Sequence, residues 1–162
     1  MFAELAEYPN IQSVKESTRD LTNVTRMLNR FGDRFKILGG VDTIALETQL
    51  LGAHGSVAGL VDAFPYETVA IYRLAQAGRL EEALAIYRWF MPLLELDIHP
   101  RLVQYIKLAA KAEGLGNEYV RAPRLPLEEQ ELQRVQKIID DAIATRPELP
   151  DYLSLPTEIT VS

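Results

Sequence analysis

The spacing of apolar residues alternates along the first half of the chain between two patterns. Short apolar runs typical of β-strands occupy Ile11–Lys15, Phe35–Leu38 and Gly55–Leu60. Between and after these runs, apolar residues recur three or four positions apart, which predicts amphipathic helices. These helices are expected to end at Gly32, Gly52 and Gly78, because glycine commonly follows a helix C-terminus. A short helix over residues 2–8 is expected before the first strand.

Strands that alternate with helices at this short spacing predict a parallel sheet. After Gly78 the pattern is helical only, over Leu80–Leu96, Pro100–Glu113 and Leu127–Thr145. The predicted division is residues 1–78 with three parallel strands and their helices, 79–146 with C-terminal helices, and 147–162 as an extended tail. Three parallel strands alone leave sheet edges unpaired, so either another copy of the chain or a larger barrel is expected to complete the sheet.

Composition narrows the classes of function. The 162 residues are 48% hydrophobic, which predicts one domain with a sizeable core. A net charge of -6 without clustered lysine or arginine argues against a nucleic-acid partner. No apolar run approaches the roughly 20 residues that cross a bilayer, and no leader pattern opens the chain, so we expect no membrane partner and a cytoplasmic location. There is no cysteine, and the only histidines are His54 and His99, so no metal site is expected.

Four motifs in order carry a resemblance to a known family. They are Tyr8–Ile11, Val14–Ser17, Leu38–Asp42 and Leu51–Val57. In sequence and spacing they resemble strands six, seven and eight of the dihydrodipicolinate synthase/N-acetylneuraminate lyase family, with the likeness running from about Phe2 to Ala144. The resemblance implies an α/β fold that is the C-terminal half of the family's domain: a partial (β/α)₈ TIM barrel, strands six to eight, followed by an all-helical C-terminal segment.

The helical region resembles one branch of that family more than the others. The segments concerned are Tyr87–Pro92, Leu102–Leu108 and Val120–Leu127. They look closest to the branch that deaminates 1-pyrroline-4-hydroxy-2-carboxylate. Other branches are synthases, lyases and dehydratases, all acting on a 2-oxo acid or a related imine, so pyruvate is the simplest substrate to expect.

Lys15 is the candidate catalytic residue. In a strand, Ser13 and Lys15 share one face and Val14 and Glu16 the other. The resemblance implies that the lysine amine attacks the ketone of a 2-oxo acid and forms a Schiff base, without any cofactor or metal. Amines become nucleophiles when burial or a nearby cation favours their neutral form. The alternative is a lysine whose ammonium group simply reaches solvent.

Two further strand ends supply candidate substrate-binding residues. Gly39 and Gly40 either bring bare backbone close to a ligand or make a tight turn into the next helix. Ser56 and Val57 resemble the last barrel strand, whose backbone lines the pocket in this family; close packing against neighbouring strands is the alternative. Glu16 and Ser17 are expected to orient and cap rather than to transfer protons.

The resemblance also implies missing parts. Family members use a threonine-rich turn and a tyrosine from earlier strands, which this sequence does not contain. We therefore expect an incomplete chain, with little or no turnover in isolation even if Lys15 is intact. The alternative function is a non-catalytic half-barrel scaffold or one part of a split enzyme. In either case we expect a homo-oligomer, at least a dimer, or a complementary half-barrel as partner.

Overall fold

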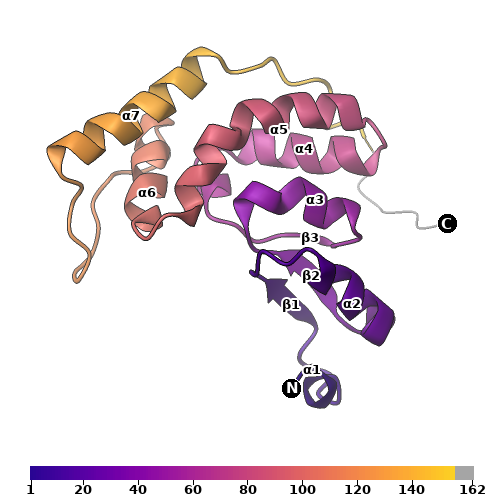
Figure 1. The fold of residues 1–162 in the computed structure, drawn as a ribbon. Helices are drawn as coiled ribbons and strands as arrows, with labels where there is room; N and C mark the ends of the chain where they lie inside the picture. Colours follow the sequence, from indigo (N-terminus) through magenta and orange to yellow (C-terminus); the bar gives the residue numbers. More distant parts are fainter. Residues whose placement is uncertain (156–162) are drawn as a thin grey trace. The chain divides into compact units, whose positions relative to one another are not determined.

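The computed structural model describes residues 1–155, and it is mostly helical (Figure 1). The helices are α1 Phe2–Leu5, α2 Thr22–Phe31, α3 Ala45–Leu50, α4 Pro65–Gln76, α5 Leu80–Leu94, α6 Leu102–Ala112 and α7 Glu129–Ala144. The strands are β1 Ser13–Glu16, β2 Lys36–Gly39 and β3 Gly55–Ser56. The chain separates into two compact units, Met1–Ala58 (unit 1) and a second that begins at Gly59 (unit 2). No helix in the described part is long and apolar enough to cross a membrane.

The predicted fold class is wrong. The sequence predicted a partial barrel of strands six to eight followed by a separate helical segment, but the strands hold only four, four and two residues and form one small open sheet. The expected third strand over 55–60 shrinks to Gly55–Ser56. The physical reason is composition, since two glycines in this stretch leave few side chains to hold an extended strand. Most of the described chain is helix, and the sequence pattern predicted more strand than the structure contains.

Unit 1 is built around a three-stranded parallel sheet in the order β1-β2-β3. Val14 pairs with Ile37, Glu16 with Gly39, and Gly39 in turn with Ser56. Helix α2 covers one face of the sheet, where Val24 and Met27 pack with Ile37 and Ala53. The helix ends at Gly32 as predicted, where φ is +52°. The sheet therefore has one face closed by α2, and its strand ends lie side by side.

Arg34 fixes the segment that leads into β1. Its guanidinium donates hydrogen bonds to the carbonyls of Ala6 at 2.8 Å, Tyr8 at 2.7 Å and Ile11 at 2.8 Å. The same group lies 4.7 Å from the centre of the Phe35 ring. A planar guanidinium directs several hydrogen bonds within one plane, whereas the three donors of an ammonium point in tetrahedral directions. Arg34 thus ties the chain before β1 to the start of β2.

Unit 2 contains the larger helical core. Phe64 packs edge-on against Phe90 with ring centres 5.5 Å apart, and Val135 and Ile139 of α7 are fully buried. Pro65 occupies the first turn of α4 as predicted, and Gly78, with φ at +75°, follows its end. The predicted helices after residue 78 are confirmed as α5, α6 and α7, each within two residues of the expected ends.

A partly buried ion-pair network joins α4, the end of α6 and the segment that follows α7 in unit 2. Arg146 lies 2.6 Å from a carboxylate oxygen of Glu113, after α6, and 3.3 Å from one of Glu67 in α4. The Glu67 side chain is only 3% exposed, and its second carboxylate oxygen has no hydrogen-bond partner among the described residues. The Arg146 guanidinium also lies 5.3 Å from the centre of the Phe64 ring. The charge of Glu67 is therefore balanced by Arg146.

The described part of the predicted tail lies against its own unit. Tyr152 is 7% exposed, and the carbonyl of Leu153 accepts a hydrogen bond from Arg73 of α4 at 3.0 Å. Residues 156–162 of the expected tail lie outside the described residues. The boundary expected after residue 78 stays a prediction; the compact units divide at Ala58, which places α4 with the helices that follow it.

Replacing Arg34 with lysine tests the tie before β1. Lysine keeps the charge but cannot bond three carbonyls in one plane, so the free energy of unfolding is expected to fall by about 1–2 kcal/mol. Hydrogen exchange should also speed up over residues 6–16. Arg30→Lys is the control, because Arg30 stacks on Phe31 at 5.4 Å and donates no hydrogen bond to a carbonyl within residues 1–155. Equal effects of the two substitutions would contradict this account.

Replacing Arg146 with methionine tests the partly buried network. Glu67 would keep a buried charge without its cation, and the free energy of unfolding is expected to drop by about 3 kcal/mol. Adding Glu67→Gln removes that charge and should restore part of the loss. Urea unfolding of the single and double variants measures both changes. A double variant no more stable than Arg146→Met would show that the charge of Glu67 does not cause the loss of stability.

Candidate active site

The five residues predicted for the site lie at one end of the unit 1 sheet. The register aligns Lys15 with Leu38 and Gly39 with Ser56. Beyond the strands, the amide of Gly40 donates to the carbonyl of Glu16 at 2.7 Å, and that of Val57 donates to Gly39 at 2.7 Å. Lys15, Gly39, Gly40, Ser56 and Val57 are therefore brought together from three strands.

Lys15 points away from the face that α2 covers. Its neighbour Val14 packs against the core cluster under α2, and side chains alternate along a strand, so Lys15 lies on the opposite face. Lys36, which pairs with Ser13, shares that face but sits at the other end of the sheet. The Lys15 side chain is exposed within this chain. The described residues alone do not supply the shielding that an uncharged amine would need.

Gly40 is packed closely against the Lys15 side chain. A Cβ atom at residue 40 would lie 2.6 Å from Cε and 2.9 Å from Cγ of Lys15, and it would also clash with the hydroxyl of Ser17. Gly39 is similarly crowded, with Thr48 Cγ2 3.0 Å from the equivalent position. The absence of a side chain at residue 40 thus makes room for Lys15 and Ser17. The groups that approach this glycine pair are side chains of the protein itself, and its contact with a ligand stays a prediction.

The polar residues after Lys15 shape the turn into α2. The Glu16 carboxylate accepts hydrogen bonds from the Thr18 amide at 3.1 and 3.2 Å. The Asp20 carboxylate accepts from the amide of Thr22 at 3.1 Å, and hydrogen bonds from Thr22 lower the pKa of Asp20. Glu16 therefore holds the turn that follows β1, with its carboxylate toward the loop, and it does not cap α2, whose N-terminus has no side-chain cap.

His54 lies at the opposite end of β3 from the candidate site. Its Nδ1 accepts a hydrogen bond from the Ile37 amide at 3.2 Å, which places the ring proton on Nε2. Partial burial, helped by the charge of Lys36, lowers the pKa of His54. The contact joins β2 to the chain before β3. Within residues 1–155, no three His, Asp or Glu side chains gather in an arrangement able to hold a metal ion.

A pocket of about 700 Å³ lies beside β1, but it does not coincide with the meeting point of the strand ends. Its lining combines Phe2 of α1, residues 14–18, and polar residues of α2 such as Arg26. Of the five predicted residues, only Lys15 borders it. The predicted substrate-binding residues thus form an open edge within this chain, while the concave surface lies on the α1 and α2 side.

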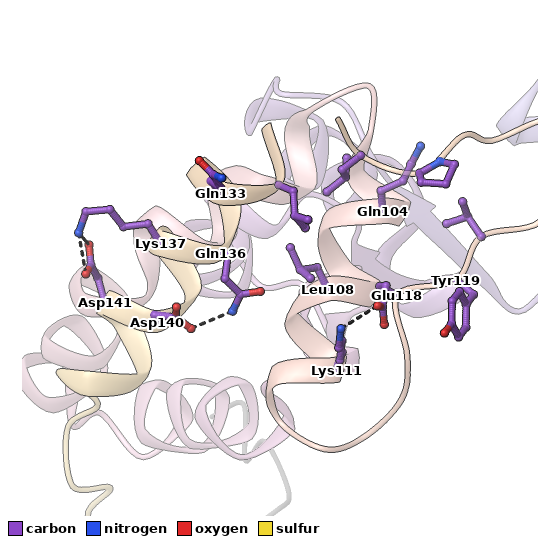
Figure 2. A pocket seen from close by; sticks show the side chains of 14 residues that line it. Gln104, Leu108, Lys111, Glu118, Tyr119, Gln133, Gln136, Lys137, Asp140 and Asp141 are labelled. Carbon is purple, nitrogen blue, oxygen red and sulfur yellow. Dashed lines mark hydrogen bonds and ion pairs between the residues drawn. The ribbon is translucent and has the colours of Figure 1, made fainter. Parts of the chain in front are cut away.

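Sequence reasoning missed a second pocket, of about 780 Å³, in unit 2 (Figure 2). It is bordered by α6, α7 and the connecting loop over 113–128. Gln104 lies in its wall and is 8% exposed. A glutamine within an amphipathic helix carries no pattern that distinguishes a pocket residue from a surface one, so the sequence held no signal for it.

Comparison with known proteins gives a consistent family. Residues 1–142 match the model of the Dihydrodipicolinate synthetase family. The chain is similar to two proteins named 4-hydroxy-tetrahydrodipicolinate synthase, from Methanospirillum hungatei (28% identity, 86% of this chain and 48% of that protein) and from Cellvibrio japonicus (31% identity, 82% and 46%). The chain spans about half the length of the curated relatives it matches.

Solved structures show the same likeness. The 4-hydroxy-tetrahydrodipicolinate synthase of Methylacidiphilum fumariolicum matches with a TM-score of 0.74 at 27% identity, over 88% of this chain and 49% of that one. A dihydrodipicolinate synthase of Bacillus anthracis matches with a TM-score of 0.81 at 24% identity, over 91% and 49%, which shows the fold alone. The family match starts at residue 1 and continues through the helices to residue 142. The helices therefore belong to the matched domain, and the assignment of strands six to eight with a separate helical segment is not retained.

Substituting Gly40 with alanine tests the close packing at the candidate site. The added methyl group meets the Ser17 hydroxyl and the Cε and Cγ atoms of Lys15, so both side chains must move aside and the free energy of unfolding should fall by about 1 kcal/mol. The ¹³Cε and ¹⁵Nζ resonances of Lys15 are the measurement. Gly55→Ala is the control, because its methyl would lie 3.5 Å from Leu38, an ordinary contact. Unchanged Lys15 resonances in Gly40→Ala would contradict the packing described.

Proposed function

Because the chain belongs to the Dihydrodipicolinate synthetase family, a family of lyase- and synthase-type function, we propose that Lys15 forms a Schiff base with a 2-oxo acid. The observation that supports this role is the position of Lys15 in β1, against Gly40 and beside two further strand ends. Active sites of parallel α/β proteins form at the carboxyl ends of the strands. Lys15 is the only lysine within the last two residues of a described strand.

The chemistry needs few protein groups. The neutral amine of Lys15 would attack the C2 carbonyl of the 2-oxo acid and give a carbinolamine, which loses water to become an iminium. The positive nitrogen then withdraws electrons from the neighbouring carbon, so a bond to that carbon can form or break. Hydrolysis of the iminium returns the lysine and releases the product. Water balances both ends of the cycle, and no redox partner is needed.

The neighbouring strand ends would hold the substrate. Ser56 and Val57 are exposed at the end of β3, and Gly39 lies between that strand and β1. In the proposal, backbone groups of these residues, with Gly40, line the side of the ketone opposite the amine. The amine also has to be shielded from water before it can react at neutral pH. Shielding would come from whatever covers the exposed face of the sheet in the working assembly.

The relatives and the sequence resemblance point to different substrates. The relatives described above are named 4-hydroxy-tetrahydrodipicolinate synthases, whereas residues 87–92, 102–108 and 120–127 resemble the deaminase of 1-pyrroline-4-hydroxy-2-carboxylate. Both reactions are compatible with a lysine that forms an imine. The deaminase branch therefore stays a prediction. The cytoplasmic location also stays a prediction.

One observation favours a second candidate function. Strands β1 and β3 each pair only with β2 among the described residues, so each offers an unpaired edge. Such edges bind further strands readily. In this alternative the chain is a non-catalytic scaffold or one part of a split enzyme, and its partner is a second copy or a complementary chain. Lys15 would then be an ordinary exposed lysine.

Trapping with borohydride separates the two functions. The 162-residue chain is incubated with pyruvate and sodium borohydride, which reduces an imine to a stable amine, and peptide mass spectrometry locates the adduct. Once association of the chain covers the exposed face of the sheet, modification is expected predominantly on Lys15, at least about tenfold above any other lysine, and it should disappear in Lys15→Arg. Lys36→Arg is the matched control, because Lys36 is exposed on the same face of the sheet.

The outcomes differ clearly. Selective modification of Lys15 that survives Lys36→Arg supports Schiff-base chemistry. Uniform low labelling of all lysines, in a chain shown by circular dichroism to be folded, contradicts it and favours the scaffold. A parallel incubation with 1-pyrroline-4-hydroxy-2-carboxylate, followed by the same reduction, tests the deaminase branch against pyruvate.

A further inference from the structure

The pocket of unit 2 has an apolar wall and a polar rim (Figure 2). Leu108 of α6 and Leu132 of α7 line it, together with Val120 and Leu127 of the connecting loop. Its volume of about 780 Å³ is in the range of sites that bind small molecules. All of its lining residues belong to unit 2, and none of them takes part in the proposed Lys15 chemistry.

Gln104 gives this pocket an unused hydrogen-bond acceptor. The side chain is more than nine-tenths buried, and its amide nitrogen donates to the carbonyl of Leu125 at 3.0 Å. A backbone carbonyl can only accept, so this contact fixes the orientation of the side-chain amide. The remaining carbonyl oxygen, Oε1, receives no hydrogen bond from any residue in the described part of the chain. Because Oε1 is accessible to solvent, a ligand with an N–H or O–H group can donate a hydrogen bond to it in place of water.

The charged residues of the rim already have partners. Lys111 contacts Glu118 at 2.7 Å, and Lys137 contacts Asp141 at 2.7 Å; Figure 2 shows one pair on α7 and the other between α6 and the loop. Gln136 similarly donates to Asp140 at 2.8 Å. A charged ligand would have to break one of these pairs or remain without a counter-ion. An uncharged ligand would leave them intact.

We propose that the unit 2 pocket binds a small, uncharged, amphipathic molecule whose N–H or O–H group donates to Gln104 Oε1 and whose apolar body packs on Leu108 and Leu132. The class includes aromatic rings that carry a single donor. Apolar contact supplies most of the affinity, and the hydrogen bond selects donors over molecules of equal shape that lack one.

Two probes of nearly equal size test this selection. Indole carries one N–H group, and benzofuran replaces that group with an oxygen that cannot donate. NMR titration of the ¹⁵N-labelled 162-residue chain gives the dissociation constant of each probe and locates the shifts. Indole is expected to bind about fivefold more tightly than benzofuran, with shifts on α6, α7 and the loop over 113–128.

Matched variants assign the effect to Gln104. In Gln104→Met the acceptor is lost while the length of the side chain is kept, so the preference for indole should fall to about equal binding. Gln133→Met is the control, because Gln133 lies on the same rim, is exposed, and bonds to Glu129. It should keep the fivefold preference.

Several results would overturn the proposal. These are equal binding of the two probes to the unmodified chain, no binding of either at millimolar concentration, or shifts confined to unit 1. Retention of the preference in a folded Gln104→Met would do the same. Should that variant not fold by circular dichroism, the comparison of the two probes on the unmodified chain still decides the outcome.

Discussion

The parallel register of three short strands is the constraint on which the candidate site depends. It aligns Glu16 with Gly39 and Gly39 with Ser56, so chain segments some forty residues apart end at the same edge. Ladder hydrogen bonds alone would hold strands of two to four residues weakly. Packing of α2 on one face, and the contacts of Arg34 before β1, supply what the short ladder lacks. The Schiff-base role proposed for Lys15 gives this arrangement a chemical meaning, because Lys15 lies at that edge.

The sheet is uncovered on the face that carries Lys15. The other face is closed by α2, so the chain has buried one side of its sheet and left the reactive candidate in solvent. Parallel sheets are normally covered on both faces. In the proposed function, catalysis by Lys15 and association through the sheet are linked, since the same covering would desolvate the amine and pair the strand edges. Unit 2 contains a separate pocket, and none of the residues that line it belongs to the sheet.

Local elements were predicted well from the sequence, and the architecture was not. Gly32, Gly78 and Pro65 marked helix ends correctly because their backbone preferences act locally. The strand containing Lys15 was expected over 11–15 and is found as Ser13–Glu16. The fold class failed because short apolar runs do not reveal how few residues a strand will hold, as the two-residue β3 shows. The burial of Gln104 and the contact between Arg146 and Glu67 depend on distant segments, which no local pattern encodes.

The three carbonyls bound by Arg34 have a consequence for how the chain tolerates changes in length. The guanidinium spans Ala6, Tyr8 and Ile11 at once, so an inserted or deleted residue between them would pull at least one carbonyl out of reach. The loop over 17–21 has no comparable tie to β2. Natural variants of this chain should therefore accumulate insertions after Lys15 and keep a constant number of residues before it.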